Sequence, residues 1–64
     1  MIPGAVYYVT WIEQGLTLQV RKERLRFESE HPSGMLVFAF EDGFGSVAVI
    51  PSRVMGYQLA EANR

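Results

Sequence analysis

Short runs of β-branched and aromatic residues, separated by Gly and Pro, are the feature that most constrains the fold of this chain. Their apolar side chains recur with a period of two, the pattern of a β-strand whose successive side chains point to opposite faces of a sheet. Five segments follow this pattern, at residues 5–12, 16–29, 35–40, 46–50 and 56–60. The sequence therefore predicts one all-β domain over residues 1–64.

Turn-forming residues separate these segments. Glu13-Gln14-Gly15 predicts a turn, and residues 31–34 (His-Pro-Ser-Gly) interrupt the chain before the third strand. Residues 41–45 give the clearest hairpin signal, because an Asp-Gly pair is followed by a second Gly. Pro51 ends the fourth strand, because proline cannot donate a hydrogen bond to a sheet.

The second segment contains a conflict of phase. Leu16, Leu18 and Val20 share one parity, whereas Leu25 and Phe27 share the other. A regular strand cannot bury both sets on one face. The residues at 21–24 (Arg-Lys-Glu-Arg) are weak turn formers, so we expect one long bent strand over 16–29. Its phase would shift between Arg21 and Arg24, through a β-bulge or, less favoured, a tight turn.

Residues 52–62 have two interpretations. One is a single turn of 3-10 helix at 52–55, capped by Ser52, followed by a strand at 56–60 and a tail at 61–64. The other is a helix over 52–62 with Met55, Leu59 and Ala62 on one stripe. Gly56 costs such a helix about 1 kcal/mol relative to Ala, which favours the first interpretation.

The predicted element order has five strands, a bent second strand, a tight hairpin between the third and fourth, and a 3-10 turn before the fifth. This order resembles that of SH3-like and Sm-like barrels. The resemblance is one of architecture and implies a small five-stranded barrel. It implies no function, since one fold serves many functions.

The size of the chain predicts association. A domain of 64 residues buries only about 60% of the surface that its unfolded form exposes. Small domains usually offset this with disulfides, a structural metal or oligomerisation. The chain has no Cys and one His, while 48% of its residues are hydrophobic. We therefore expect a homo-oligomer, most simply a dimer, in which apolar surface is covered by another subunit.

Charge and hydropathy predict no membrane contact. The formal net charge is -1, which gives no overall attraction to anionic lipid. The start, Met1-Ile2-Pro3-Gly4, lacks the charged and apolar regions of a signal peptide. The longest apolar run, residues 35–40, is far shorter than the roughly 20 residues of a membrane helix. These features favour a cytoplasmic location.

The residues that carry chemistry do not form a recognisable catalytic motif. His31 is the single imidazole and Asp42 the single Asp. A hydrolase triad of Ser, His and Asp would therefore have to use both of these residues. Glu28, Glu30 and His31 are the one group that a metal or acid–base reaction would use, and strand-end carboxylates are usually solvated. We expect no enzyme, no cofactor and no metal.

Residues 43–48 (Gly-Phe-Gly-Ser-Val-Ala) match the residue pattern of a dinucleotide-binding fingerprint. The fingerprint requires a βαβ unit around it, which this sequence lacks, so the match indicates no dinucleotide site.

A basic cluster suggests a second functional class. Four of the six Lys and Arg residues lie within residues 21–26, namely Arg21, Lys22, Arg24 and Arg26. Cations beside aromatic rings bind single-stranded nucleic acid in small barrels. A solvated strand edge explains the same residues, and Glu23, Glu28 and Glu30 oppose phosphate binding. Alternation places Lys22, Arg24 and Arg26 on one face and Arg21 on the other, unless a bulge intervenes.

Aromatic residues point more strongly to a protein partner. Tyr7 and Tyr8 are adjacent on a strand and cannot both face the core, and Phe44 lies at a hairpin tip. Surface Tyr and Trp side chains are common interface anchors. The candidate partner-binding residues are Tyr7, Tyr8, Trp11 and Phe44. The leading hypothesis is a non-catalytic binding or assembly module that self-associates or binds another protein, and the alternative is a small nucleic-acid-binding protein.

Overall fold

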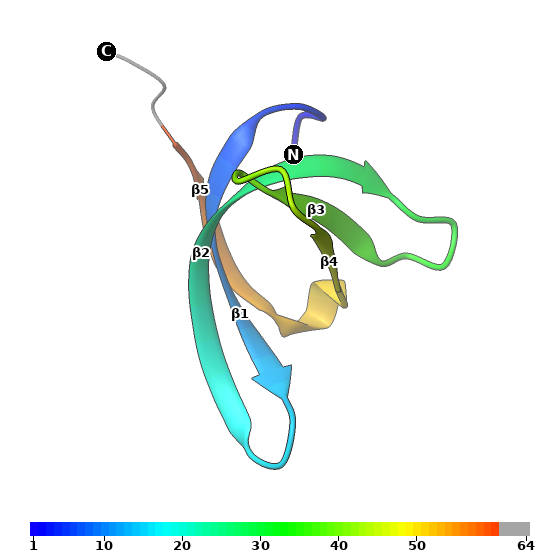
Figure 1. Ribbon diagram of the computed structural model, residues 1–64. Helices are drawn as coiled ribbons and strands as arrows, with labels where there is room; N and C mark the ends of the chain where they lie inside the picture. Colours follow the sequence, from blue (N-terminus) through cyan, green and yellow to red (C-terminus); the bar gives the residue numbers. More distant parts are fainter. Residues whose placement is uncertain (61–64) are drawn as a thin grey trace.

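The computed structural model describes residues 1–60 and is built from five antiparallel strands in one sheet. The all-β prediction is confirmed. The strands are β1 (Val6–Gln14), β2 (Leu18–Glu30), β3 (Leu36–Phe40), β4 (Ser46–Val49) and β5 (Val54–Leu59), with the 3-10 helix η1 (Pro51–Arg53) before β5. Their order across the sheet is β4-β3-β2-β1-β5, so β4 and β5 are the two edges of an open sheet (Figure 1).

The 13-residue strand β2 is shared by two parts of the sheet. Its first nine residues pair with β1, and five of its last six pair with β3, so that Leu25 and Arg26 pair on both sides. Figure 1 shows the sheet curling along β2, so that β3 and β4 turn away from the plane of β1 and β5. The prediction of a long, bent second strand is confirmed.

The predicted phase shift between Arg21 and Arg24 is wrong. The register between β1 and β2 runs without interruption from Val6↔Arg26 to Gln14↔Leu18. The irregularity lies instead between Phe27 and Ser29, where β2 pairs with β3. No shift is needed earlier, because Leu18 and Val20 do not reach the core: they remain 66% and 62% exposed.

The core lies on the concave face of the curled sheet. Phe38, Leu25 and Val9 are completely buried there, and the rings of Phe27 and Phe38 meet edge to face at 5.6 Å. The other buried residues packed with them are Tyr7, Trp11 and Val49. Each comes from a position that alternates with an outward residue, as the period of two requires. The backbone N–H of Ile2 donates to the Tyr7 hydroxyl at 2.8 Å, so the polar end of the buried Tyr7 side chain has a hydrogen-bond partner.

The hairpin predicted at residues 41–45 connects β3 to β4. Gly43 and Gly45 have φ of 83° and 108°, values that L-residues with a Cβ rarely adopt. The Asp42 carboxylate accepts the Phe44 N–H at 2.8 Å and so fixes the turn. The sequence signal and the structure agree here because both depend on local backbone geometry.

Over residues 52–60, the interpretation as a 3-10 turn followed by a strand is correct and the helix is wrong. Residues 61 and 62 of the alternative helix, and the predicted tail at 61–64, lie outside the described residues. Ser52 is not the cap, because η1 begins at Pro51 and has no side-chain cap. Pro51 suits this first position, since its missing N–H would be unpaired there in any case.

A pair of phenylalanines tests this description of the core. Phe38→Ala should lower the free energy of unfolding by about 3 to 5 kcal/mol, because the ring is completely buried. A loss of this size is comparable to the whole stability of a domain this small. Phe44→Ala should stay within about 0.5 kcal/mol of the parent, because this ring is 85% exposed. Urea unfolding followed by circular dichroism measures both. Equal midpoints for the two variants would contradict the assignment.

Candidate functional site

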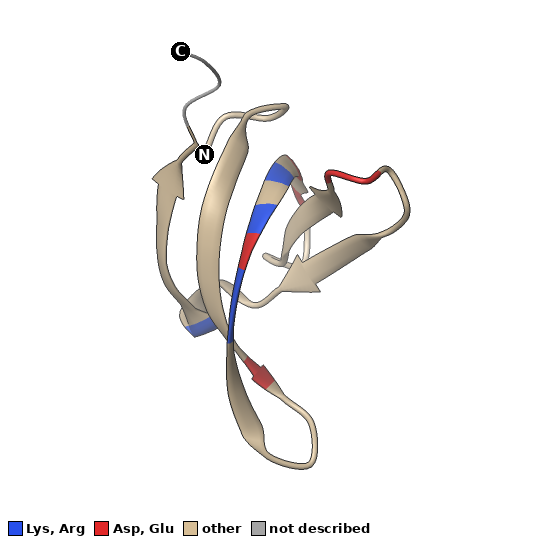
Figure 2. Cartoon of the chain, turned by 60° about the vertical axis from the view of Figure 1, so that its left-hand side comes forward, with Lys and Arg blue, Asp and Glu red and all other residues tan. Residues whose placement is uncertain are grey.

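The basic cluster lies along the middle of β2, where Figure 2 shows cationic segments interrupted by an acidic one. Lys22, Arg24 and Arg26 face Thr10, Tyr8 and Val6 of β1, on the convex side of the sheet. Arg21 faces the buried Trp11 and therefore lies on the concave side. The structure thus brings together three of the four predicted cations and separates the fourth.

Two of the three convex cations already have acidic partners. Arg24 Nε lies 3.0 Å from Glu41 Oε1, and Arg26 Nε lies 3.6 Å from Glu28 Oε2. The Arg24 guanidinium also lies 5.9 Å from the centre of the Tyr8 ring, within the range of a cation–π contact. These exposed ion pairs are weak, so a phosphate can compete for the arginines, but it must displace a carboxylate to do so.

Arg21 has a structural role on the concave face. Its guanidinium binds the carboxylates of Glu13, at 2.7 Å, and of Glu23, and lies 5.9 Å from the centre of the Trp11 ring. The hydrogen bond to Glu23, followed by that to Glu13, raises the pKa of Arg21 above its usual value. The charged group thus lies over the Trp11 ring and can remain hydrated there.

The four candidate partner-binding aromatics divide into two pairs. Tyr7 and Trp11 are 5% and 4% exposed and belong to the core, whereas Tyr8 and Phe44 are 43% and 85% exposed. A partner can therefore reach Tyr8 and Phe44 but not the two buried rings. Alternation along β1 explains the division, because Tyr7 and Tyr8 must point to opposite faces.

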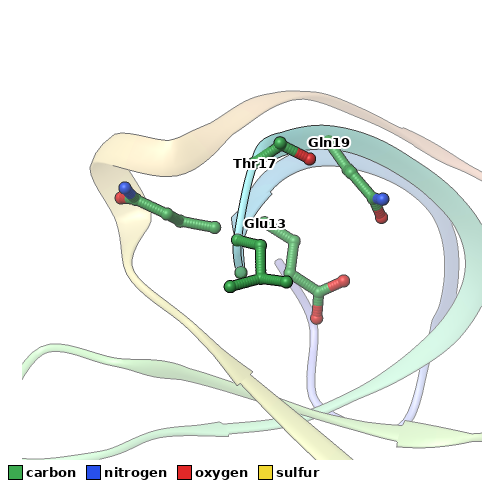
Figure 3. Close-up of a pocket in the computed structure, with 6 residues that line it drawn as sticks. Glu13, Thr17 and Gln19 are labelled. Carbon is green, nitrogen blue, oxygen red and sulfur yellow. The ribbon is translucent and has the colours of Figure 1, made fainter.

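A depression of about 550 Å³ lies at the β1–β2 hairpin (Figure 3). Glu13 and Gln19 are cross-strand neighbours there, and Thr17 lies nearby in the turn. Its single ionisable group, Glu13, is already bound to Arg21. The lining residues all belong to this hairpin: Glu13, Gln14, Gly15, Leu16, Thr17 and Gln19. The depression offers polar contacts but no pair of groups for acid–base chemistry.

In the group Glu28, Glu30 and His31 considered in the sequence, two members already have other partners. Glu28 pairs with Arg26, while His31 Nδ1 accepts the Ser33 N–H at 3.1 Å inside its own turn. Within residues 1–60, no three His, Cys, Asp or Glu side chains lie close enough together to hold a metal ion. Glu28 and Glu30 both line a groove of about 500 Å³, which they share with Met1, Pro3, Phe27, Ser29, Leu36 and Tyr57.

The apolar side chains of β5 were not among the predicted binding residues. Met55, Tyr57 and Leu59 are 60%, 55% and 52% exposed, although they lie on a strand of the sheet. They remain exposed because β5 is an edge and nothing packs beyond it within the described chain. The sequence contains a signal for this exposed edge. Charged side chains and Pro usually protect an edge strand from pairing, and the six residues of β5 contain neither.

No protein-family model, curated protein or solved structure matches this chain. Over the described residues, the structure contains no helix of the length and hydropathy required to cross a bilayer. The candidate sites therefore rest on geometry and chemistry.

Replacing Arg21 tests its role over Trp11. Arg21→Leu should lower the urea midpoint more than Lys22→Leu, because Arg21 binds two carboxylates whereas the structure gives Lys22 no ion pair. Part of the difference should disappear in about 1 M salt, which screens exposed charges. Equal midpoints for the two variants at low salt would show that the Arg21 contacts contribute nothing.

Proposed function

We propose that this protein is a non-catalytic assembly module that associates with itself, most simply as a dimer. The observation that carries the proposal is the amount of apolar surface. Among residues 1–60, ten large hydrophobic side chains are exposed, whereas eight residues form the buried apolar core. An excess of this kind on a small chain is usually covered by a partner. Self-association supplies that partner without any other component.

Within the all-β class, we propose an SH3-like or Sm-like architecture. The order of five strands, the bend in β2 and the position of η1 between β4 and β5 support it. The open edges at β4 and β5 are where a closed barrel would require further pairing. The expected cytoplasmic location belongs to the same proposal and rests on the sequence features described above.

The mass in solution tests self-association directly. Light scattering of the full chain from about 10 μM to 1 mM should give a mass that rises toward at least twice that of one chain. Dilution should reverse the rise, because association obeys mass action. A mass of one chain throughout this range, with an intact fold by circular dichroism, would overturn the proposal.

A second candidate function is binding to single-stranded nucleic acid. The supporting observation is the convex row of Lys22, Arg24 and Arg26 beside the exposed Tyr8 ring. A hollow of about 160 Å³ lies next to Lys22 and Tyr8, where a base or sugar can be accommodated. Ion pairing of Arg24 and Arg26 reduces the net attraction, so this candidate ranks second.

Salt dependence distinguishes this candidate from the first. Three phosphate contacts require a log–log slope of affinity against salt of about −2, from −0.7 per phosphate for single strands. Fluorescence anisotropy with a labelled oligonucleotide at low salt measures the slope. The double variant Arg24→Glu, Arg26→Glu should abolish binding, and Arg53→Glu, a distant control on η1, should preserve it. Binding that survives the double variant would place the site elsewhere.

A further inference from the structure

Strand β5 presents an unpaired backbone edge. It pairs with β1 on one side and is the last strand of the sheet on the other. Figure 1 shows it at one margin of the curled sheet, following the 3-10 helix. A free edge of this kind is a template for another strand, because its N–H and C=O groups have no partner in the sheet.

The hydrogen-bond pattern identifies which groups are free. The Ala60 N–H donates to the Val6 carbonyl at 2.9 Å, so residue 60 faces β1. In an antiparallel ladder the facing direction alternates, so Gln58 and Gly56 also face β1. The N–H and C=O groups of Tyr57 and Leu59 therefore point away from β1, toward the open edge.

The side chains of the same residues are incompletely covered. Tyr57 and Leu59 lie opposite Val9 and Tyr7, on the face that carries the core, yet both are about half exposed. The Tyr57 ring touches the Tyr7 ring edge to face at 5.6 Å, and its other side remains open. The free backbone groups and the uncovered apolar side chains thus occur at the same two residues.

The charge pattern favours a second copy of the same strand as the partner. A two-fold axis presents the same strand from both copies, so that residue i meets j and j meets i, and a strand with charges of one sign would repel itself. β5 (Val54–Leu59) contains no charged residue and no Pro. The other edge, β4, is also uncharged, but it has only four residues and its exposed side chains are the small Ser46 and Ala48.

We propose that two copies of this chain pair antiparallel through β5, giving a continuous sheet across a two-fold axis close to Tyr57. This inference rests on the proposed self-association and names the surface that performs it. In this register each Tyr57 exchanges backbone hydrogen bonds with its equivalent, and Leu59 lies opposite Met55 of the second copy, the position at which the pairing of β5 with β1 shifts register. An axis perpendicular to the sheet keeps Tyr57 and Leu59 of both copies on one face, so their apolar surfaces merge.

The size of this interface sets the expected affinity. Six residues of edge bury less than the roughly 800 Å² per partner of a standard protein interface. We therefore expect a dissociation constant in the micromolar range or weaker. Association of this strength is reversible on dilution, which allows the monomer and the dimer to be compared in one sample.

Amide hydrogen exchange, followed by NMR at low and high concentration, tests the pairing residue by residue. The Gln58 amide should be protected at both concentrations, because it bonds to β1. The Tyr57 and Leu59 amides should exchange rapidly at low concentration and become protected as the mass doubles. Fast exchange at Tyr57 and Leu59 in a sample that light scattering shows to be dimeric would overturn the inference and leave self-association intact.

A proline substitution supplies a second measurement. Leu59→Pro removes an N–H that points to the open edge and spares the bonds to β1, so the fold should persist. The variant should raise the dissociation constant of the dimer at least about tenfold, because one intermolecular hydrogen bond is lost from each of the two copies. The matched control, Leu59→Ala, keeps the backbone N–H and should raise the dissociation constant by a smaller factor.

The distant variant Phe44→Ser separates the two proposals. A dimer that resists Leu59→Pro but dissociates with Phe44→Ser would place the interface at the β3–β4 hairpin, which contradicts β5 pairing and retains self-association. A parent protein that remains monomeric up to 1 mM would overturn both proposals. Loss of the dimer in Leu59→Pro alone, with circular dichroism unchanged, is the expected result.

Discussion

A single sheet can enclose a core only by folding over its own face, and the rest of this structure depends on β2 allowing that. β2 pairs with β1 along its first part and with β3 along its last, so both parts of the sheet contribute side chains to one interior. The irregularity at Glu28 lies at the point where the strand changes partners. Bulges increase the local twist and bend of a strand, which is what the change of partner requires.

The interior formed in this way is small, and the surplus of apolar residues follows from its size. Core positions are filled by large rings such as Phe38 and Trp11, whereas Leu18 and Val20 lie on the convex face with Lys22 and remain exposed. Toward the β1–β2 hairpin, the concave face carries the Arg21 guanidinium and its two carboxylates. A charged group can cover an aromatic face and remain hydrated, so the core ends at Trp11 without an apolar cap.

The sequence predicted the features that depend on local geometry. Period-two alternation located the five strands, and Asp42-Gly43 located the hairpin, because both patterns are read over a few residues. The phase shift in β2 was misplaced because we assumed that Leu16–Val20 and Leu25–Phe27 share the core. Which apolar residues reach a core depends on which face of each strand is covered, and that depends on contacts between distant strands. For the same reason the alternation separated Tyr7 from Tyr8 but did not reveal that Trp11 is buried beneath Arg21.

The position of β5 at an edge was likewise not predictable from local pattern. Its partner, β1, is more than forty residues away in sequence, and nothing within Val54–Leu59 specifies which side remains open. Absence of charge was the informative feature, and it gains meaning only once the strand is known to be an edge.

Stability and association are coupled in such a molecule. β5 is held by one neighbouring strand, so its attachment to the sheet is weaker than that of β1 or β2, which have two. Any partner that binds the folded chain and not the unfolded one stabilises the fold by mass action. Pairing at the open edge would therefore strengthen a strand that is supported on one side only, and through Tyr7 and Val9, its cross-strand contacts, the core itself. A chain with no disulfide and a small interior gains from a partner that contacts this strand, because backbone bonds and buried apolar area are then added to the unsupported side of an edge.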